Sequence, residues 1–201
     1  MLTGFVAGSL VLVGMLPAGA AARGGCRPAG SRAVFANRTV RVYRSGGRYF
    51  GCLYRVRRAV RLRAPAPSPP SDRPARFLAF RTAGTFLAYV YNDYAVDSTG
   101  DDWTLYIGSV DLRRGRLVRQ ATAIRTPGCF ADPVPPNVSS LVLKSDGAIA
   151  WVQHSCIPDS AFAADRAGTR PLGDADARSM TLHGSTLNWT NGGIPETGRL
   201  D

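Results

Sequence analysis

The sequence has little histidine and lysine, and its first half has almost no acidic residues. His154 and His183 are the two histidines, and 24 of the 25 basic residues are arginine. Between residues 23 and 92, fifteen arginines stand against a single acid, Asp72. None of the short catalytic motifs of serine hydrolases, zinc proteases or phosphate-binding loops occurs. These absences argue against a histidine-based metal site or catalytic triad, and the sequence predicts no catalytic residue.

The surplus of positive charge is the first feature that points to a partner. A formal net charge of +11 favours polyanions, which a surplus of one sign attracts over long distances. The alternative is a basic face that is only solvated. The sequence contains no nucleic-acid-binding motif.

The chain has one long hydrophobic run, from Leu2 to Leu16. Pro17 ends the run, and the alanines and glycine that follow match the small-x-small pattern read by signal peptidase. Residues 1–22 are therefore predicted to be a signal peptide, and the remaining chain to be secreted or held at the cell surface. An uncleaved anchor is the alternative, because about 20 apolar residues can span a bilayer. No second hydrophobic run follows.

The four cysteines agree with an oxidising location, because none of them lies in a C-x-x-C arrangement typical of metal sites. Cys26 and Cys52 are 26 residues apart, and Cys129 and Cys156 are 27 residues apart. Each pair also brackets one hairpin of the repeat described next. The spacing therefore favours the disulfides Cys26–Cys52 and Cys129–Cys156 among the three pairings that four cysteines allow.

A short pattern recurs along the chain, with an apolar residue four positions before a glycine and an aromatic residue four or five positions after it. The glycines are Gly84, Gly147 and Gly184, and a degenerate first copy has Asn37–Arg38 at the turn. This pattern predicts β-hairpins, because glycine readily adopts the positive φ that tight turns need. The aromatic residues are separated by 46, 62 and 38 positions and are Tyr43, Tyr89, Trp151 and Trp189.

A second pattern, strand–turn–strand with Asp at the start of the turn and Gly at its end, follows at 106–118 and at 163–172. Hairpin and turn together give about four strands per unit. The predicted repeat domain, residues 23–190, has units at about 33–63, 76–123 and 138–172 and a half-unit at 178–190. The proline-rich stretch 64–74 is a predicted linker, and 191–201 a predicted flexible tail. No apolar stripe of helical period is present.

The hairpins and the turn Val110–Gly115, which reads Val-Asp-Leu-x-x-Gly, resemble the bacterial secreted propeller-like repeats related to the TolB and WD40-like families. The resemblance covers about 110 of the 201 residues. It implies propeller blades and a scaffold role, with no catalytic residues to carry over. The predicted fold class is therefore all-β, as a propeller-like array of three to four antiparallel blades, with a β-sandwich as the alternative.

Arginines alternate with mostly apolar residues from Tyr54 to Arg63. A strand over this stretch would place four of them on one face, because side chains alternate with a period of two. Guanidinium groups suit phosphates and carboxylates, so the predicted polyanion-binding set is Arg55, Arg57, Arg61 and Arg63. The alternative is the ordinary polar outer face of an alternating strand.

Acidic residues cluster between Asn92 and Asp102. Ca²⁺ takes six to eight oxygen ligands. The predicted calcium ligands are Asp93, Asp97, Asp101 and Asp102, although their spacing differs from an EF-hand loop. The alternative is a solvated loop between strands, and no other cofactor is expected.

The predicted function is a secreted, non-enzymatic propeller-like binding or scaffold module. Its expected partner is a polyanionic cell-wall or extracellular polymer, or another protein. The alternative is an extracellular hydrolase or lyase with an Asp/Arg site at the propeller mouth, because the fold alone does not exclude catalysis.

Overall fold

The computed structural model describes residues 25–62, 76–97, 100–125, 137–154 and 159–201, and the regular structure in these residues is all β-strand. None of these residues belongs to a helix long and apolar enough to cross a membrane. The predicted signal peptide 1–22, the linker 64–74, Cys129 and Cys156 lie outside the described residues.

The described strands form four antiparallel sheets, each a meander of strands consecutive in the chain. The first sheet contains β1 (Arg32–Ala36), β2 (Val40–Ser45), β3 (Arg48–Leu53) and β4 (Arg58–Arg61). The second contains β5 (Arg76–Ala83), β6 (Phe86–Asp97), β7 (Gly100–Asp111) and β8 (Arg116–Arg125). The third contains β9 (Asn137–Leu143), β10 (Ile149–His154), β11 (Ser160–Asp165) and β12 (Gly168–Asp174). The fourth contains β13 (Thr181–His183), β14 (Thr186–Asn191) and β15 (Ile194–Arg199).

The prediction of an all-β protein built from repeated sheets is confirmed. The three hairpin glycines carry the turns as expected, since Gly84, Gly147 and Gly184 have φ angles of +59°, +94° and +62°. Asn37 makes the first turn by another route, because its side-chain Oδ1 accepts hydrogen bonds from the N–H groups of Thr39 and Val40. Four separate sheets replace the two that a β-sandwich would have.

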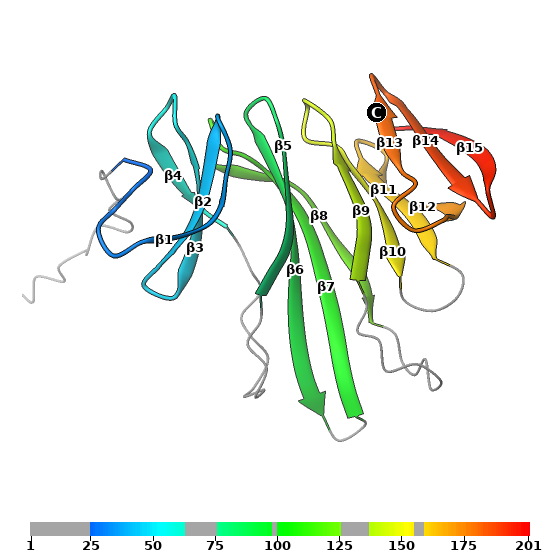
Figure 1. Cartoon of the computed structure of the whole chain (residues 1–201), viewed down its shortest axis with the longest axis horizontal. Coiled ribbons are helices and arrows are strands. Elements are labelled where there is room, and N and C mark those ends of the chain that lie inside the picture. The colour runs from blue at the N-terminus through cyan, green and yellow to red at the C-terminus, as the bar shows by residue number, and fades with distance from the viewer. Residues whose placement is uncertain (1–24, 63–75, 98–99, 126–136, 155–158) are drawn as a thin grey trace, which may run out of the picture.

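The four sheets stand side by side in an arc, with the first and last sheets at opposite ends (Figure 1). A separate apolar core fills each of the three junctions between consecutive sheets. The first strands of neighbouring sheets lie together, because β9 lies beside both β5 and β13. At the junction of the first and second sheets, the ring centres of Phe35 in β1 and Phe80 in β5 are 5.4 Å apart.

The repeat aromatics explain the stacking. Each lies on the second strand of its sheet and is almost completely buried: Tyr43, Tyr89, Trp151 and Trp189. Tyr89, Trp151 and Trp189 belong to the cores shared with the preceding sheet. Within the described residues no sheet comes before the one that carries Tyr43, and Tyr43 packs with the disulfide Cys26–Cys52. The residues on either side of each aromatic point to the opposite face, because side chains alternate along a strand.

Two stretches differ from the sequence-based expectations. Residues 191–201 were expected to be a flexible tail, but Ile194–Arg199 forms β15 and pairs along the whole of β14. Pro195 is compatible with this position, because an edge strand tolerates a residue without an N–H group. The expected acidic loop also differs, because β6 and β7 remain paired through Asp97 and Gly100. Tyr94, Val96 and Trp103 in this hairpin favour extended strands.

Candidate anion-binding site

Positive charge is concentrated on the first sheet. Residues 25–62 contain no aspartate or glutamate, and their arginines are Arg27, Arg32, Arg38, Arg41, Arg44, Arg48, Arg55, Arg57, Arg58 and Arg61. All of these are exposed except Arg41, which is partly buried. Such a surplus creates a positive potential over this end of the molecule.

The predicted row of arginines on one strand face is wrong. Residues 54–57 form a turn, in which the N–H groups of Val56 and Arg57 donate to the carbonyl of Leu53 at 3.1 and 2.9 Å. Arg57, the last residue of this turn, adopts a left-handed φ of +52°, and β4 begins at the next residue. Only Arg61 of the four lies on β4, Arg55 and Arg57 lie on the turn, and Arg63 is outside the described residues.

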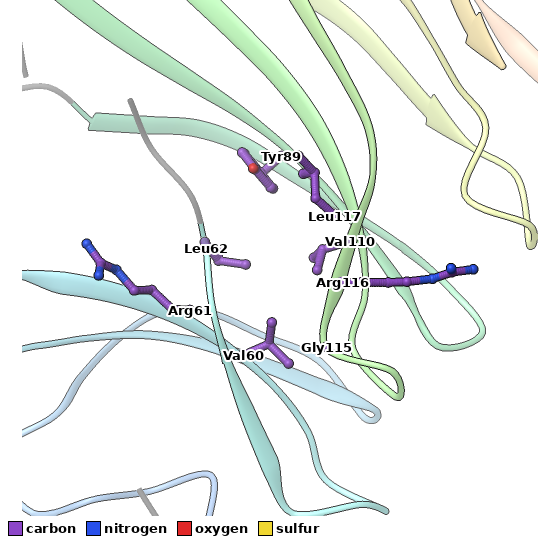
Figure 2. Close-up of a pocket in the computed structure, with 8 residues that line it drawn as sticks. All are labelled: Val60, Arg61, Leu62, Tyr89, Val110, Gly115, Arg116 and Leu117. Atoms are coloured by element: carbon purple, nitrogen blue, oxygen red, sulfur yellow. The ribbon is translucent and has the colours of Figure 1, made fainter. Parts of the chain in front are cut away.

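A cleft of about 330 Å³ lies at the junction of the first and second sheets. Its lining residues are Val60, Arg61, Leu62, Tyr89, Val110, Gly115, Arg116 and Leu117. Figure 2 shows that the apolar side chains from β4 and from β7 and β8 face one another, whereas Arg61 and Arg116 extend away in opposite directions. The cleft thus has an apolar floor with a cation at each side.

Arg58 adds a third cation to this junction, which the sequence analysis did not single out. Its Nη1 donates to the carbonyl oxygen of Arg113 at 3.4 Å, so the side chain reaches from β4 to the turn of the second sheet. Its Nη2 lies 2.9 Å from the place that a Cβ on Gly115 would occupy. Gly115 lies in the turn between β7 and β8 and has a φ of +73°, which glycine adopts readily. Because Gly115 has no side chain, the turn also leaves room for the guanidinium of Arg58.

The turn Asp111–Arg116, which carries Arg116, places two more arginines beside the cleft, Arg113 and Arg114. Oδ1 of Asp111 accepts the N–H groups of Arg113 and Arg114 at 2.9 and 3.1 Å, which is the Asp-started turn that the sequence predicts. Asp111 is 4% exposed, and its Oδ2 lies 3.7 Å from Nε of Arg114. The Asp111 carboxylate therefore interacts within its own turn, and the guanidinium groups of Arg113 and Arg116 remain exposed. The repeated Asp–Gly turn was the sequence signal for these residues.

The structure describes only the backbone of the four predicted calcium ligands. The backbone of Asp93, Asp97, Asp101 and Asp102 lies in the β6–β7 hairpin, and their side chains are outside the described part of the chain. Among the side chains that are described, no group of three or more His, Cys, Asp or Glu residues is placed to hold a metal ion. The calcium site stays a prediction.

The two histidines lie in different sheets, His154 on β10 and His183 on β13. Nδ1 of His154 lies 2.5 Å from Oδ1 of Asp159. Within the described residues, no serine or cysteine is hydrogen-bonded to this pair. This His–Asp contact lies at the end of β10, an inner strand of the third sheet.

The disulfide Cys26–Cys52 is present, with the two Cα atoms 5.4 Å apart. It ties the segment before β1 to β3, over the outer face of the first sheet. Disulfides form and persist in oxidising compartments. In sequence comparisons, no protein-family model and no curated protein matches the chain.

Proposed function

We propose that the chain is a secreted, propeller-like binding module that holds an anionic extracellular polymer on its first sheet without converting it chemically. The repeated stacking supports the propeller-like description. Each sheet places an aromatic residue of its second strand against the structure that precedes it, as successive blades would. The disulfide supports a location outside the cytoplasm.

The observation that carries the binding proposal is the unneutralised charge of the first sheet. Ten arginines without one acid in residues 25–62 favour an anionic ligand, and the cleft adds Arg116 from the second sheet to Arg58 and Arg61. Guanidinium groups donate two parallel hydrogen bonds to a carboxylate, sulfate or phosphate. Arg61 and Arg116 flank the cleft from its two sides, where the first and second sheets meet.

The same arginines have a second physical use. β4 and β8 are edge strands of their sheets, and charged side chains on an edge prevent pairing with other chains. Arginines that only prevent edge pairing need no ligand, and they would not give the protein a salt-dependent affinity for a polymer. Binding measurements therefore separate the two.

The enzymatic alternative has no observation that favours it. In the part of the chain that the structure describes, the cleft is not lined by a carboxylate or an imidazole, and neither is a pocket beside the disulfide, whose lining residues are Gly25, Cys26, Arg27, Tyr54 and Arg57. A hydrolase or lyase acting there would need a general base from elsewhere.

The test compares two variants of equal net charge. Arg61→Gln/Arg116→Gln removes two cations from the cleft, and Arg166→Gln/Arg199→Gln removes two exposed cations from the third and fourth sheets. Binding to heparin and to a teichoic-acid-like glycerol-phosphate polymer is measured by titration calorimetry at two salt concentrations.

We expect the parent to bind more weakly as salt rises, because neutralising a charged polymer releases its counterions. The cleft variant should bind the polymer about 10-fold more weakly than the control variant. Each exposed ion pair between an arginine and an anionic group of the polymer contributes up to about 1 kcal/mol, and the cleft variant loses two of them. Equal affinities of the two variants would overturn the assignment to this cleft. Binding of another protein, with neither polymer bound, would overturn the choice of ligand.

A further inference from the structure

A second pocket, of about 410 Å³, lies beside the disulfide of the first sheet. Gly25, Cys26 and Arg27 line it from the segment before β1, and Tyr54 and Arg57 line it from the turn between β3 and β4. The bond between Cys26 and Cys52 joins these two parts of the chain covalently. We call this space the disulfide pocket.

The cations of the disulfide pocket are held together without a described counter-charge. Arg27 and Arg57 are both exposed, and no acid lines the pocket. A third guanidinium is tied to the same segment, because Nη1 of Arg41 donates to the carbonyl oxygen of Cys26 at 2.7 Å. Like charges gathered in this way repel one another, so a bound anion lowers their electrostatic energy.

The segment that carries Arg27 also packs against aromatic residues of the first sheet. Arg41 lies 5.5 Å from the ring centre of Tyr43, and burial raises the pKa of Tyr43 while the charge of Arg41 lowers it in part. Tyr43 stacks in turn on Phe50, with ring centres 5.4 Å apart. The segment that carries Arg27 therefore rests on a packed aromatic layer as well as on the disulfide.

We propose that the disulfide pocket is a second anion subsite, in which Arg27 and Arg57 bind one oxyanion group of the polymer that the cleft holds. This inference rests on the proposed function for the identity of the polymer. The ligand group is a sulfate, carboxylate or phosphate ester, which share the oxygen geometry that guanidinium groups recognise. The subsite depends on the disulfide, because Arg27 follows directly after Cys26 and is held in place by that bond.

The first experiment measures affinity and its salt dependence for four proteins: the parent, Arg27→Gln/Arg57→Gln, the cleft variant and the control variant. A heparin-derived octasaccharide and a glycerol-phosphate oligomer serve as probes, so that sulfated and phosphorylated sources are distinguished. We expect the pocket variant to bind roughly 10-fold more weakly and its salt slope to fall by about two, one for each lost cation.

The outcomes separate the two proposals. If the pocket variant binds like the control variant while the cleft variant is weakened, the subsite is overturned and the proposed function stands. If all four proteins fail to bind either probe, the proposed function falls. If only one probe shows the pocket effect, that probe identifies the oxyanion.

A second experiment tests the dependence on the disulfide. Cys26→Ala/Cys52→Ala should weaken binding as much as Arg27→Gln does, and adding Arg27→Gln to it should change nothing further, because both remove the same contact. Circular dichroism checks that the cysteine variant folds, and if it does not, Arg27→Gln in the disulfide-bonded protein remains the test. A folded cysteine variant with the affinity of the parent would overturn the inference.

Discussion

The two ends of the array differ in charge and in the way they are held. The first sheet carries ten arginines and no acid over residues 25–62. The described residues of the third and fourth sheets carry seven acids and five bases, among them Asp165, Asp176 and Lys144. The first sheet is closed by a disulfide, whereas the fourth is anchored by buried and half-buried carboxylates. The first sheet therefore carries positive charge without acidic residues, whereas the last two sheets contain carboxylates that accept hydrogen bonds.

The face of the fourth sheet that points away from the third differs in polarity from the same face of the other three sheets. The positions beside the repeat aromatic pack against the next sheet in the first three sheets, where they include Val42, Val90 and Val152. In the fourth sheet the corresponding residues are Asn188 and Thr190, which are only partly buried. A polar face of this kind needs no further sheet packed against it, as in the capping repeats of stacked proteins.

The largest effect is expected at the aromatic of the fourth sheet. Trp189 is 5% exposed, and its Nε1 donates to the carbonyl of Asp174 at 3.1 Å. Trp189→Ala should lower the free energy of unfolding by about 3–5 kcal/mol, because a large cavity opens between the last two sheets. Urea unfolding followed by circular dichroism measures this loss. Ile194→Ala is the control, since Ile194 is 66% exposed, and equal losses at both sites would contradict the repeat alignment.

The disulfide should be the main support of the first sheet. Removing it with Cys26→Ala/Cys52→Ala should cost about 3.5 kcal/mol, the chain-entropy value for a loop of 26 residues. Hydrogen exchange should then increase in β1–β4 and stay unchanged in β13–β15. Uniform exchange throughout the chain would show that the two ends unfold as one unit.

Acid should loosen the fourth sheet before the first. Burial alone would raise the pKa of Asp165, but hydrogen bonds from Arg170, Asp201 and Ala167 outweigh it and hold the pKa below its ordinary value. A carboxyl with a lowered folded pKa stabilises the fold above its unfolded pKa of about 4, and this contribution is lost as pH falls through the folded pKa. Hydrogen bonds from Thr190 and from the Gly193 and Gly192 N–H groups lower the pKa of Asp176 in the same direction.

An acid titration followed by amide NMR signals measures this difference. Signals of β13–β15 should change below about pH 4, while those of β1–β4, which contain no carboxylate, should persist to lower pH. Asp165→Asn should reproduce the change at neutral pH at a cost of about 1–3 kcal/mol, because charged hydrogen bonds are lost. Simultaneous loss of both sets of signals would contradict the proposed anchoring.

The sequence allowed much of the fold to be predicted, because hairpin glycines and aromatics are local signals. Gly84, Gly147 and Gly184 and the Asp111 turn behave as their residue types require. Of the strand expected at Tyr54–Arg63, the structure shows only Arg58–Arg61, because residues 54–57 form a turn in which Arg57 has a left-handed φ. The cleft was missed for another reason: Arg58 of the first sheet reaches the carbonyl of Arg113 in the second sheet, and a linear sequence does not show which sheet edges lie together.

The smallest effect on stability, and the most informative about the end of the array, is expected on the outer face of the fourth sheet. Asn188→Val/Thr190→Val gives this face the apolar residues that pack against a next sheet elsewhere in the chain. Both side chains are only partly buried, but the Thr190 hydroxyl also donates to Asp176, so we expect a loss of no more than about 0.5 kcal/mol at Asn188 and about 1 kcal/mol at Thr190. The variant should nevertheless self-associate, because an exposed apolar sheet face recruits a partner. Sedimentation velocity over a range of concentrations measures the association, and Asn188→Thr/Thr190→Ser, which keeps the face polar, is the control. Equal sedimentation of both variants would contradict the prediction, because it would show that the polar residues Asn188 and Thr190 are not what prevents another sheet from packing on this face.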